Sequence, residues 1–277
     1  MKICVVTGSR ADYGLLEWPI KLLTADPFFE VEIKRVWNES YQSAFSHASS
    51  IDADMIMLLG DRYEIHAVAT AAHLKRIPIA HIGGGDVTEG SYDDAMRDAI
   101  SRMASIHFVT STSAMARLTH LGYRNIHLVG SPGIDYIKHA DWRRPRWIEK
   151  PYVVVSYQPE TLDGTNEIQS ILKSLDKMAV FIMPNPDLGS DEIKQAIYRY
   201  CDGNDSFWQE FYPHDQFLNL ISYCDEFIGN SSAMLYEAPE LGVKTRMIGK
   251  RQRGRIIPWG DGHASERILK ILKYTHL

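Results

Sequence analysis

The 277-residue chain lacks the features that mark secreted, membrane and disulfide-rich proteins. Its three cysteines, Cys4, Cys201 and Cys224, show neither CxxC nor Cys/His spacing, which favours free thiols in a reducing compartment over disulfides or zinc. No apolar run approaches the roughly 18 residues that cross a bilayer, and the N-terminal MKICVVTGSR has no signal-peptide core. We therefore expect a soluble, cytoplasmic protein without a membrane partner.

The chain also lacks an excess of positive charge and the common cofactor motifs. Its formal net charge of −5 gives no reason to expect a nucleic-acid partner. No GxGxxG run follows any predicted strand, so a nicotinamide cofactor has no support. His81 and Asp86 lack a third ligand in helical or strand register, and we expect no metal and no other cofactor.

What is present is a regular alternation of short β-branched runs with amphipathic stretches. Runs such as CVVT and MIMLL are apolar at nearly every position, as strands buried on both faces must be. The alternation predicts an α/β fold with parallel, doubly wound sheets. The predicted strands of the first half are Lys2–Thr7, Val31–Val36, Asp54–Leu59, Ile77–Ile82, Ile106–Thr110 and Ile126–Val129, and the predicted helices are Tyr13–Leu23, Glu64–Leu74, Ala95–Met103 and Thr112–Leu121.

The alternation breaks at Ser131–Lys150, which mixes proline, charge and tryptophan and is interpreted as an interdomain connection. We therefore predict two Rossmann-like parallel-sheet domains, residues 1–135 and 151–263, with a ligand in the crevice at the carboxyl ends of their strands. The predicted elements of the second half are strands Tyr152–Tyr157, Val180–Met183, Glu226–Ile228 and Thr245–Ile248, and helices Glu167–Lys177, Asp191–Tyr200, Asp215–Tyr223, Ala233–Leu241 and Ala264–Tyr274.

Two charged motifs follow strands of the first half, and each has two interpretations. In TGSRADYG, Arg10 and the glycine turn suit a phosphate, or Arg10 simply pairs with Asp12. In LLGDRYE, Asp61, Arg62 and Glu64 reach the crevice, or Asp61 and Glu64 form a capping box for the next helix. Neither motif by itself decides between ligand binding and local structure.

A third motif, HIGGGDVTEGSYDDAMRDAI, follows the fourth predicted strand. Its three glycines allow a ligand to approach the backbone closely. Asp93 and Asp94 stand at the predicted start of a helix, and Arg97 lies one turn further on.

In the second half, GNSS before a predicted helix indicates an anion site. Ser231 and Ser232 offer hydroxyl and N–H groups at the positive end of the helix dipole. Capping alone explains one serine. It does not explain Glu237 on the same helix, placed to accept bonds from ribose hydroxyls, or the basic GKRQRGR run that contains Arg251.

Taken in order, these motifs resemble the hydrolysing UDP-N-acetylglucosamine 2-epimerases of sialic acid synthesis. The similarity covers essentially the whole chain, through TGSRADYG, LGDRYE, HIGGGDVT, YDDAMRDAI, QPET, PNPDLGSDE, HDQF, IGNSS, GKRQRGR and GDGHASERILKILK. It implies a GT-B-like fold, UDP bound mainly by the second half, and a C-terminal helix, residues 264–277, that returns to the first domain. It also implies a possible homodimer.

The resemblance further implies a chemistry in which a base removes the sugar C2 proton while UDP leaves C1, and water then adds to the glycal. Free N-acetylmannosamine and UDP are the products. The residues that match the family's catalytic positions are Asp61, Asp93, Arg97 and Gln158, and those matched or suggested for substrate binding are Arg10, Arg62, Glu64, Asp86, Ser231, Ser232, Glu237 and Arg251.

Three departures from the family pattern leave alternatives open. Gln158 stands where the family has histidine, and it cannot carry a proton at neutral pH. Gly83 replaces a frequent acidic residue, for which Asp86 is a candidate substitute, and the chain is shortened around Trp37–Ser50 and Arg255–Gly260. The alternatives are an enzyme for another UDP-sugar, a GT-B glycosyltransferase, and a nucleotide-sugar binder without catalysis.

Overall fold

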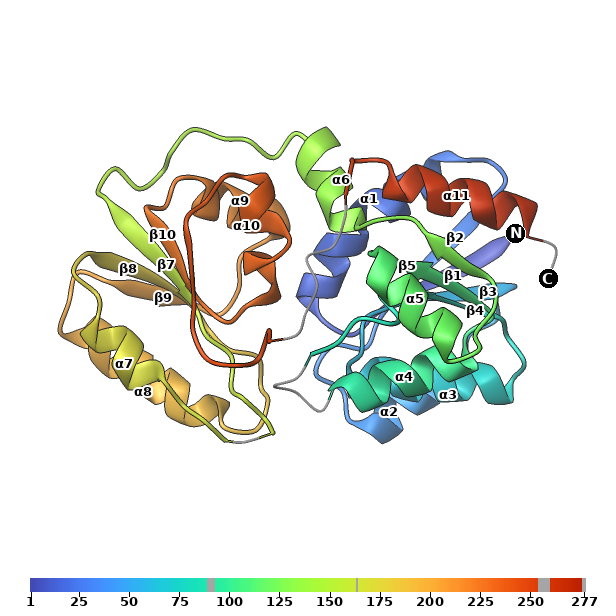
Figure 1. Cartoon of the computed structure of the whole chain (residues 1–277), viewed down its shortest axis with the longest axis horizontal. Coiled ribbons are helices and arrows are strands. Elements are labelled where there is room, and N and C mark those ends of the chain that lie inside the picture. The colour runs from blue at the N-terminus through green and yellow to red at the C-terminus, as the bar shows by residue number, and fades with distance from the viewer. Residues whose placement is uncertain (89–92, 163, 254–259, 276–277) are drawn as a thin grey trace. The chain divides into compact units, whose positions relative to one another are not determined.

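The computed structural model describes residues 1–88, 93–162, 164–253 and 260–275, except for the side chain of Arg10. The chain divides into two units, each with its own parallel sheet (Figure 1). The first unit contains Met1–Val87, Asp93–Ala140 and Ile256–Leu277, and the second is built mainly from Asp141–Arg255. The predicted α/β class with two Rossmann-like parallel sheets is confirmed.

The sheet of the first unit has the strand order β2-β1-β3-β4-β5-β6, with parallel pairing between neighbours. Because β1, β3 and β4 are neighbours, the turns that follow them meet at one edge. The strands are β1 Lys2–Thr7, β2 Glu30–Arg35, β3 Met55–Leu59, β4 Ile79–Ile82, β5 Ile106–Val109 and β6 Ile126–Leu128. The helices are α1 Arg10–Ala25, α2 Tyr41–Ser49, α3 Tyr63–Leu74, α4 Asp93–Met103, α5 Thr112–His120, α6 Pro132–His139 and α11 Ala264–Tyr274.

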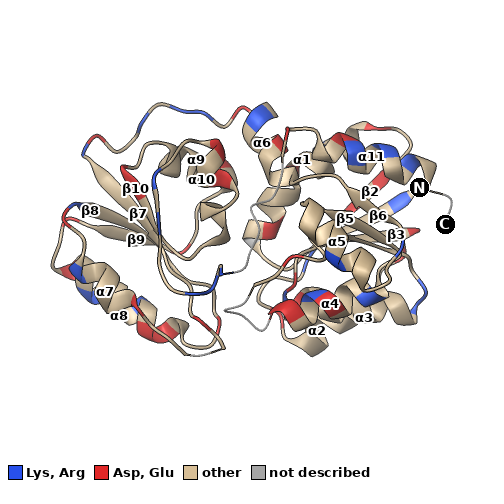
Figure 2. Ribbon diagram, viewed as in Figure 1, with Lys and Arg blue, Asp and Glu red and all other residues tan. Residues whose placement is uncertain are grey.

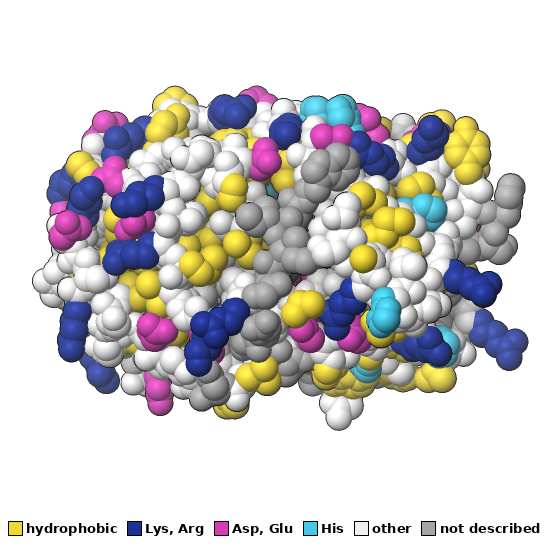
Figure 3. All heavy atoms as spheres, viewed as in Figure 1, with side chains coloured by type: hydrophobic (Ala, Val, Ile, Leu, Met, Phe, Trp, Pro, Cys, Tyr) yellow, Lys and Arg dark blue, Asp and Glu magenta, His cyan; other side chains and the backbone are white. Residues whose placement is uncertain are grey.

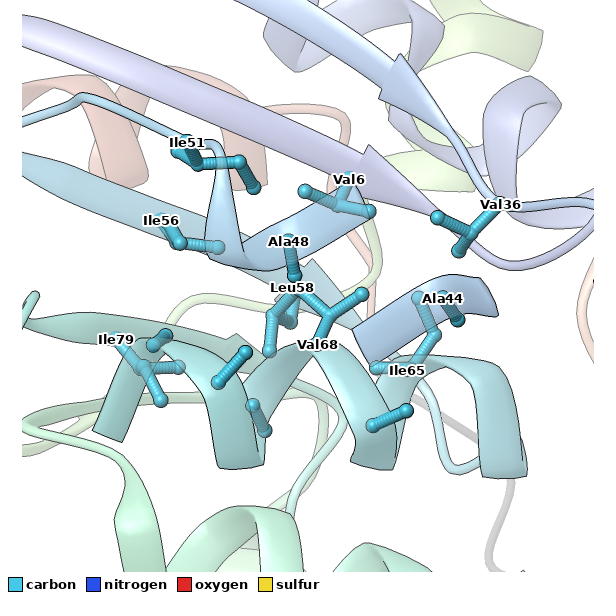
Figure 4. Close-up of a cluster of buried hydrophobic side chains, with 14 of the residues drawn as sticks. Val6, Val36, Ala44, Ala48, Ile51, Ile56, Leu58, Ile65, Val68 and Ile79 are labelled. Atoms are coloured by element: carbon cyan, nitrogen blue, oxygen red, sulfur yellow. The ribbon is translucent and has the colours of Figure 1, made fainter. Parts of the chain in front are cut away.

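Helices cover this sheet on both faces, which explains why its central strands are apolar throughout. On one face, Val6, Ile56 and Leu58 pack with side chains of α2 and α3 (Figure 4). On the other, Val5 and Met57 pack with side chains of α1 and α11. The helix α2 was absent from the sequence prediction because its YQSAFSHAS run is short and rich in serine, although Tyr41, Ala44, Phe45 and Ala48 form a narrow apolar face against the core.

The segment predicted as an interdomain connection begins with a helix, so that part of the prediction is wrong. Pro132 starts α6, as proline at a first helical position favours, and most of its residues are buried. The Asp135 carboxylate accepts hydrogen bonds from the backbone N–H groups of Ala264 (3.1 Å) and Ser265 (2.6 Å). These two bonds cap the start of α11 and attach it to α6, although the bonded residues are 129 and 130 positions apart in the chain.

The sheet of the second unit has the order β11-β10-β7-β8-β9, again with parallel pairings. The predicted single helix over Ala233–Leu241 is wrong: the chain forms a 3₁₀ turn, η1 Ser232–Met234, and a four-residue helix, α10 Glu237–Glu240. Pro239 lacks the N–H that a longer helix needs. The other elements are β7 Tyr152–Ser156, β8 Met178–Ile182, β9 Phe207–Gln209, β10 Glu226–Gly229, β11 Thr245–Met247, α7 Ile168–Lys173, α8 Ser190–Asp202 and α9 His214–Ser222.

Lys and Arg side chains are interspersed with Asp and Glu side chains over the face drawn in Figure 3. Across the part of the chain that the structure describes, no helix combines the length and apolarity needed to span a bilayer.

Candidate functional site

The carboxyl edge of the first sheet carries a cluster of charged side chains centred on Arg97. Arg97 lies on α4, is 1% exposed, and forms ion pairs with Asp61, which follows β3, and with Asp94 on its own helix. Its guanidinium also donates to the Asp86 backbone carbonyl at 2.9 Å. Burial lowers the pKa of Arg97, but the carboxylates of Asp61, Asp94 and Asp86 outweigh it and raise the pKa above its ordinary value.

This pairing bears on the two interpretations of Asp61. The residue at the N-cap of α3 is Arg62, whose own side chain makes no capping hydrogen bond. Asp61 instead contacts Arg97, 36 residues further along the chain. The Glu64 carboxylate bonds Arg62 instead of closing a capping box, which favours the site interpretation of Asp61 in the charged cluster at the sheet edge.

Arg62 and Glu64 form a second ion pair beside the first. Both Arg62 Nε and Nη2 donate to the Glu64 carboxylate, each at 3.2 Å, and the Glu64 side chain is fully buried. A buried carboxylate needs such a two-point partner. Glu64 is therefore held by Arg62 within the first unit.

Asp86 and Asp93 lie on either side of the undescribed residues 89–92. The carbonyl of Asp86 accepts from Arg97 and from Arg117 Nη1 (2.8 Å), and its carboxylate accepts from Thr110 at 3.4 Å. Asp93 is the first residue of α4, whose acidic start is visible in Figure 2. α1 begins at Arg10, but the predicted phosphate contact of its side chain lies outside the described residues.

His81 is a buried core histidine. Its Nδ1 is 3.0 Å from Ser101 Oγ and its Nε2 is 2.8 Å from the Gly60 carbonyl oxygen. Burial lowers the pKa of His81 to about 4, so the ring is neutral at physiological pH. In the described ranges, no group of three or more His, Cys, Asp or Glu side chains is placed to hold a metal ion.

Asp12, which the sequence suggested only as a partner of Arg10, adjoins this cluster from the start of α1. Its Oδ2 is buried and accepts no hydrogen bond from any residue that the structure describes. Burial raises the pKa of Asp12 to about 7, against the lowering effect of Arg62, while Asp61 and Glu64 raise it further. A carboxyl group protonated near neutrality therefore sits beside two ion-paired carboxylates.

In the second unit, Gln158 is fixed by Asn230 after the neighbouring strand β10. The Gln158 N–H donates to Asn230 Oδ1 at 2.6 Å, and Asn230 Nδ2 donates to the Gln158 carbonyl at 2.8 Å. The Gln158 side chain accepts the Asn185 N–H at 2.9 Å. Gln158 thus connects the turns that follow β7, β8 and β10.

The predicted UDP contacts of the second unit lie on two segments at the same sheet edge. Ser231 precedes η1, where its hydroxyl accepts the Ala233 N–H at 3.3 Å, and Ser232 begins the 3₁₀ turn. Glu237 begins α10 and is 7% exposed. Because these helices are so short, the helix-dipole argument for the site has no support. Arg251 follows β11 and donates to the Pro159 carbonyl at 2.8 Å.

Comparison with known proteins gives a family. The family model described as UDP-N-acetylglucosamine 2-epimerase matches residues 36–257. The chain belongs to this family. The resemblance found in the sequence is therefore confirmed at the level of an epimerase family that acts on UDP-sugars.

One relative, polysialic acid biosynthesis protein P7 of Escherichia coli, is 28% identical to this chain, and the match covers 92% of this chain and 80% of the relative's own length. GDP/UDP-N,N'-diacetylbacillosamine 2-epimerase (hydrolyzing) of Campylobacter jejuni is 32% identical, over 77% of this chain and 61% of its own length. The alignment with the Escherichia coli protein spans 313 residues, more than the 277 of this chain, so that relative has internal residues that this chain lacks.

The fold agrees with the family. The crystal structure of UDP-GlcNAc 2-epimerase from Neisseria meningitidis bound to UDP-GlcNAc has a TM-score of 0.80 at 15% identity, covering 99% of this chain and all of that one. The Staphylococcus aureus MnaA–UDP co-structure has the same TM-score and identity, covering 99% of this chain and 96% of that one.

Proposed function

We propose that this family member is a hydrolysing UDP-N-acetylglucosamine 2-epimerase that releases UDP and N-acetylmannosamine. The observation that carries the proposal is the buried Arg97, which forms ion pairs with Asp61 and Asp94 at the carboxyl edge of the first sheet. Removal of a C2 proton needs a carboxylate held in one position, and an ion pair with a rigid guanidinium supplies that.

The roles we assign follow from this arrangement. Asp61 and Asp93 act as the acid–base carboxylates at the sugar, with Arg97 holding Asp61 ionised and oriented. Arg62, Glu64 and Asp86 are weaker candidates for sugar contacts, because each is engaged with partners within the unit. Arg10 remains an assignment from the sequence motif alone.

The second unit supplies the proposed contacts with UDP. Arg251 and the hydroxyl groups of Ser231 and Ser232 bind the diphosphate, and the buried Glu237 accepts bonds from ribose. Two relatives support the ligand class, because their structures are described as complexes with UDP-GlcNAc or UDP. Three free thiols, Cys4, Cys201 and Cys224, support a cytoplasmic location.

The test is incubation of the pure protein with UDP-N-acetylglucosamine in deuterated water, followed by proton NMR. Release of free N-acetylmannosamine with deuterium at C2 supports the proposal. UDP-N-acetylmannosamine without free sugar identifies a non-hydrolysing epimerase. Consumption only with an added acceptor identifies a glycosyltransferase, and unchanged substrate with UDP binding identifies a binder or another sugar.

A second candidate is the same elimination on a UDP-linked diacetamido sugar. It is favoured by the 32% identity to the Campylobacter jejuni diacetylbacillosamine 2-epimerase. Gln158, in place of the family histidine, fits a change of sugar equally well. Running the NMR assay on both nucleotide sugars separates the two candidates by which one is consumed.

A further inference from the structure

Glu160, on the turn after β7, is a buried carboxylate that none of the roles above uses. It is 2% exposed, although a charged side chain is rarely buried without a reason. Its Oε1 accepts the backbone N–H of Lys250 at 2.6 Å, 90 residues further along the chain. Its Oε2 is also buried and accepts no hydrogen bond from the described part of the chain.

The partner of Glu160 is the loop that follows β11, residues 249–253. Gly249 has a φ of +76°, and a Cβ placed there would lie 1.8 Å from Glu160 Oε1. The loop therefore approaches the carboxylate so closely that only glycine fits at this position. Lys250 and Arg251 follow at once, so the loop carries two cations directly after its contact with a buried negative charge.

Two further bonds attach the same loop to the other turns at this edge. Arg251 Nη1 donates to the Pro159 carbonyl at 2.8 Å, and Gln252 Nε2 donates to the Asn230 carbonyl at 2.8 Å. Asn230 is in turn bonded to the backbone of Gln158. The loop thus depends on the β7 and β10 turns for its position, and Glu160 supplies the carboxylate acceptor among these contacts.

We infer that Glu160 is a positioning residue for the nucleotide site: its carboxylate fixes the Gly249–Arg253 loop in the conformation in which Arg251 meets a nucleoside diphosphate. This inference rests on the proposed binding of UDP by the second unit. A buried negative charge beside an anion site would weaken binding by repulsion if it had no other role. Its benefit is preorganisation of the loop, which lowers the entropy lost when the ligand binds.

The first experiment measures UDP affinity by calorimetry for the native protein, Glu160→Ala and Glu160→Gln. We expect Glu160→Ala to weaken UDP binding about tenfold or more, the size of one lost charge-assisted bond. Glu160→Gln keeps an acceptor for the Lys250 N–H and should bind UDP within about threefold of native. Unchanged binding in Glu160→Ala, or equal losses in both variants, would overturn the inference.

The second experiment probes the loop without a ligand, so it does not depend on the proposed function. Hydrogen exchange of the amides in residues 249–253 should accelerate about tenfold or more in Glu160→Ala and stay near native in Glu160→Gln. Equal exchange in the native protein and Glu160→Ala overturns the positioning role. A third outcome is that exchange accelerates in Glu160→Ala but the native protein does not bind UDP. That result overturns the proposed function, and with it the nucleotide part of this inference.

Glycine variants provide a matched test should Glu160→Ala fold poorly. Gly249→Ala should weaken UDP binding as Glu160→Ala does, because its methyl group displaces the carboxylate. Gly242 has a similar φ of +68°, and a Cβ added there would meet no atom within 4 Å, so Gly242→Ala imposes the backbone strain alone. Equal UDP affinity in the two glycine variants would contradict the proposed contact.

Discussion

The carboxyl edges of the two sheets hold their buried polar groups in place in different ways. At the edge of the first unit, charged side chains neutralise one another: Arg97 pairs with Asp61 and Asp94, and Arg62 pairs with Glu64. At the edge of the second unit, amide side chains and backbone groups dominate. Asn230, Gln158 and Gln252 hold turns to turns through amide hydrogen bonds.

The difference matches the chemistry expected at each edge. Ion pairs with a buried arginine hold carboxylates in one orientation, as proton transfer at a sugar carbon requires. Turns fixed through amides present N–H groups and cations to an anion without adding negative charge. Glu160 and Glu237 are buried carboxylates in the second unit, and because Glu160 bonds the loop of residues 249–253 its role can be tested separately.

Of the substitutions proposed here, removal of Arg97 should have the largest effect on stability and turnover. Arg97→Met removes the cation that pairs with Asp61 and Asp94, and we expect unfolding to become easier by about 3–5 kcal/mol and turnover to fall about 10³-fold or more. Denaturant unfolding and the NMR assay measure the two effects. Arg117→Met is the control, since Arg117 also bonds the Asp86 carbonyl but its side chain is 30% exposed. Equal losses in both variants would contradict a special role for Arg97.

Removing the anion contacts of the second unit should abolish the response to UDP and leave the fold intact. UDP at about 100 times its dissociation constant adds roughly 2.7 kcal/mol to the free energy of unfolding. Ser232→Ala combined with Arg251→Ala should eliminate this gain, measured as a shift in Tm. A double variant that responds to UDP as the native protein does would place the nucleotide site elsewhere.

Gln158 tests whether the second unit takes part in chemistry. Gln158→His introduces the histidine that the sequence resemblance implies at this position, and a ring nitrogen can still accept the Asn185 N–H. Because acid–base assistance contributes about 10²–10⁴-fold where it operates, we expect turnover of UDP-N-acetylglucosamine to rise about tenfold or more, with little change in UDP affinity. A native enzyme that is slowed by the histidine shows that Gln158 serves another sugar or a purely structural purpose.

Asp12 should give the first unit an unusual pH dependence. Its pKa is about 7 when folded, so the folded protein keeps a proton that the unfolded chain releases near pH 4. Between these values the folded state binds more protons, and the contribution of Asp12 to stability falls as pH rises, levelling above pH 7.

Asp12→Asn removes this dependence. We expect the variant to match the native protein near pH 4 and to exceed it by on the order of 4 kcal/mol at pH 8. Urea unfolding across this pH range measures the difference in free energy of unfolding between the variant and the native protein. Buried histidines such as His81 contribute equally to both proteins and cancel in this difference. Asp52→Asn is the control, since the Asp52 side chain is fully exposed. A pH-independent difference between Asp12→Asn and native would show that Asp12 is ionised throughout.

Chelation of divalent metal ions should not change turnover. Turnover measured with and without EDTA should be equal, since the proposed elimination relies on carboxylates and arginines and the described residues contain no metal-ligand cluster. Loss of turnover on chelation, restored by one divalent ion, would contradict this mechanism.

The sequence alone determined the fold class and the order of the motifs. Strands such as MIMLL are apolar on both faces, and this property depends only on local composition, so β3 and its neighbours were predictable. Short or marginal elements were not: α2 is a short, serine-rich helix, β9 is a three-residue strand, and α6 begins in a proline-containing segment.

Only the tertiary structure decided which charges meet. The sequence placed Asp61 equally well at a helix cap or in a site, and its contact with Arg97 depends on β3 and β4 lying side by side. Glu160 and Gly249 are far apart in the chain, so no local pattern revealed their contact. Periodicity reports which residues face a core, whereas pairs of buried polar groups form between segments that only the folded chain brings together.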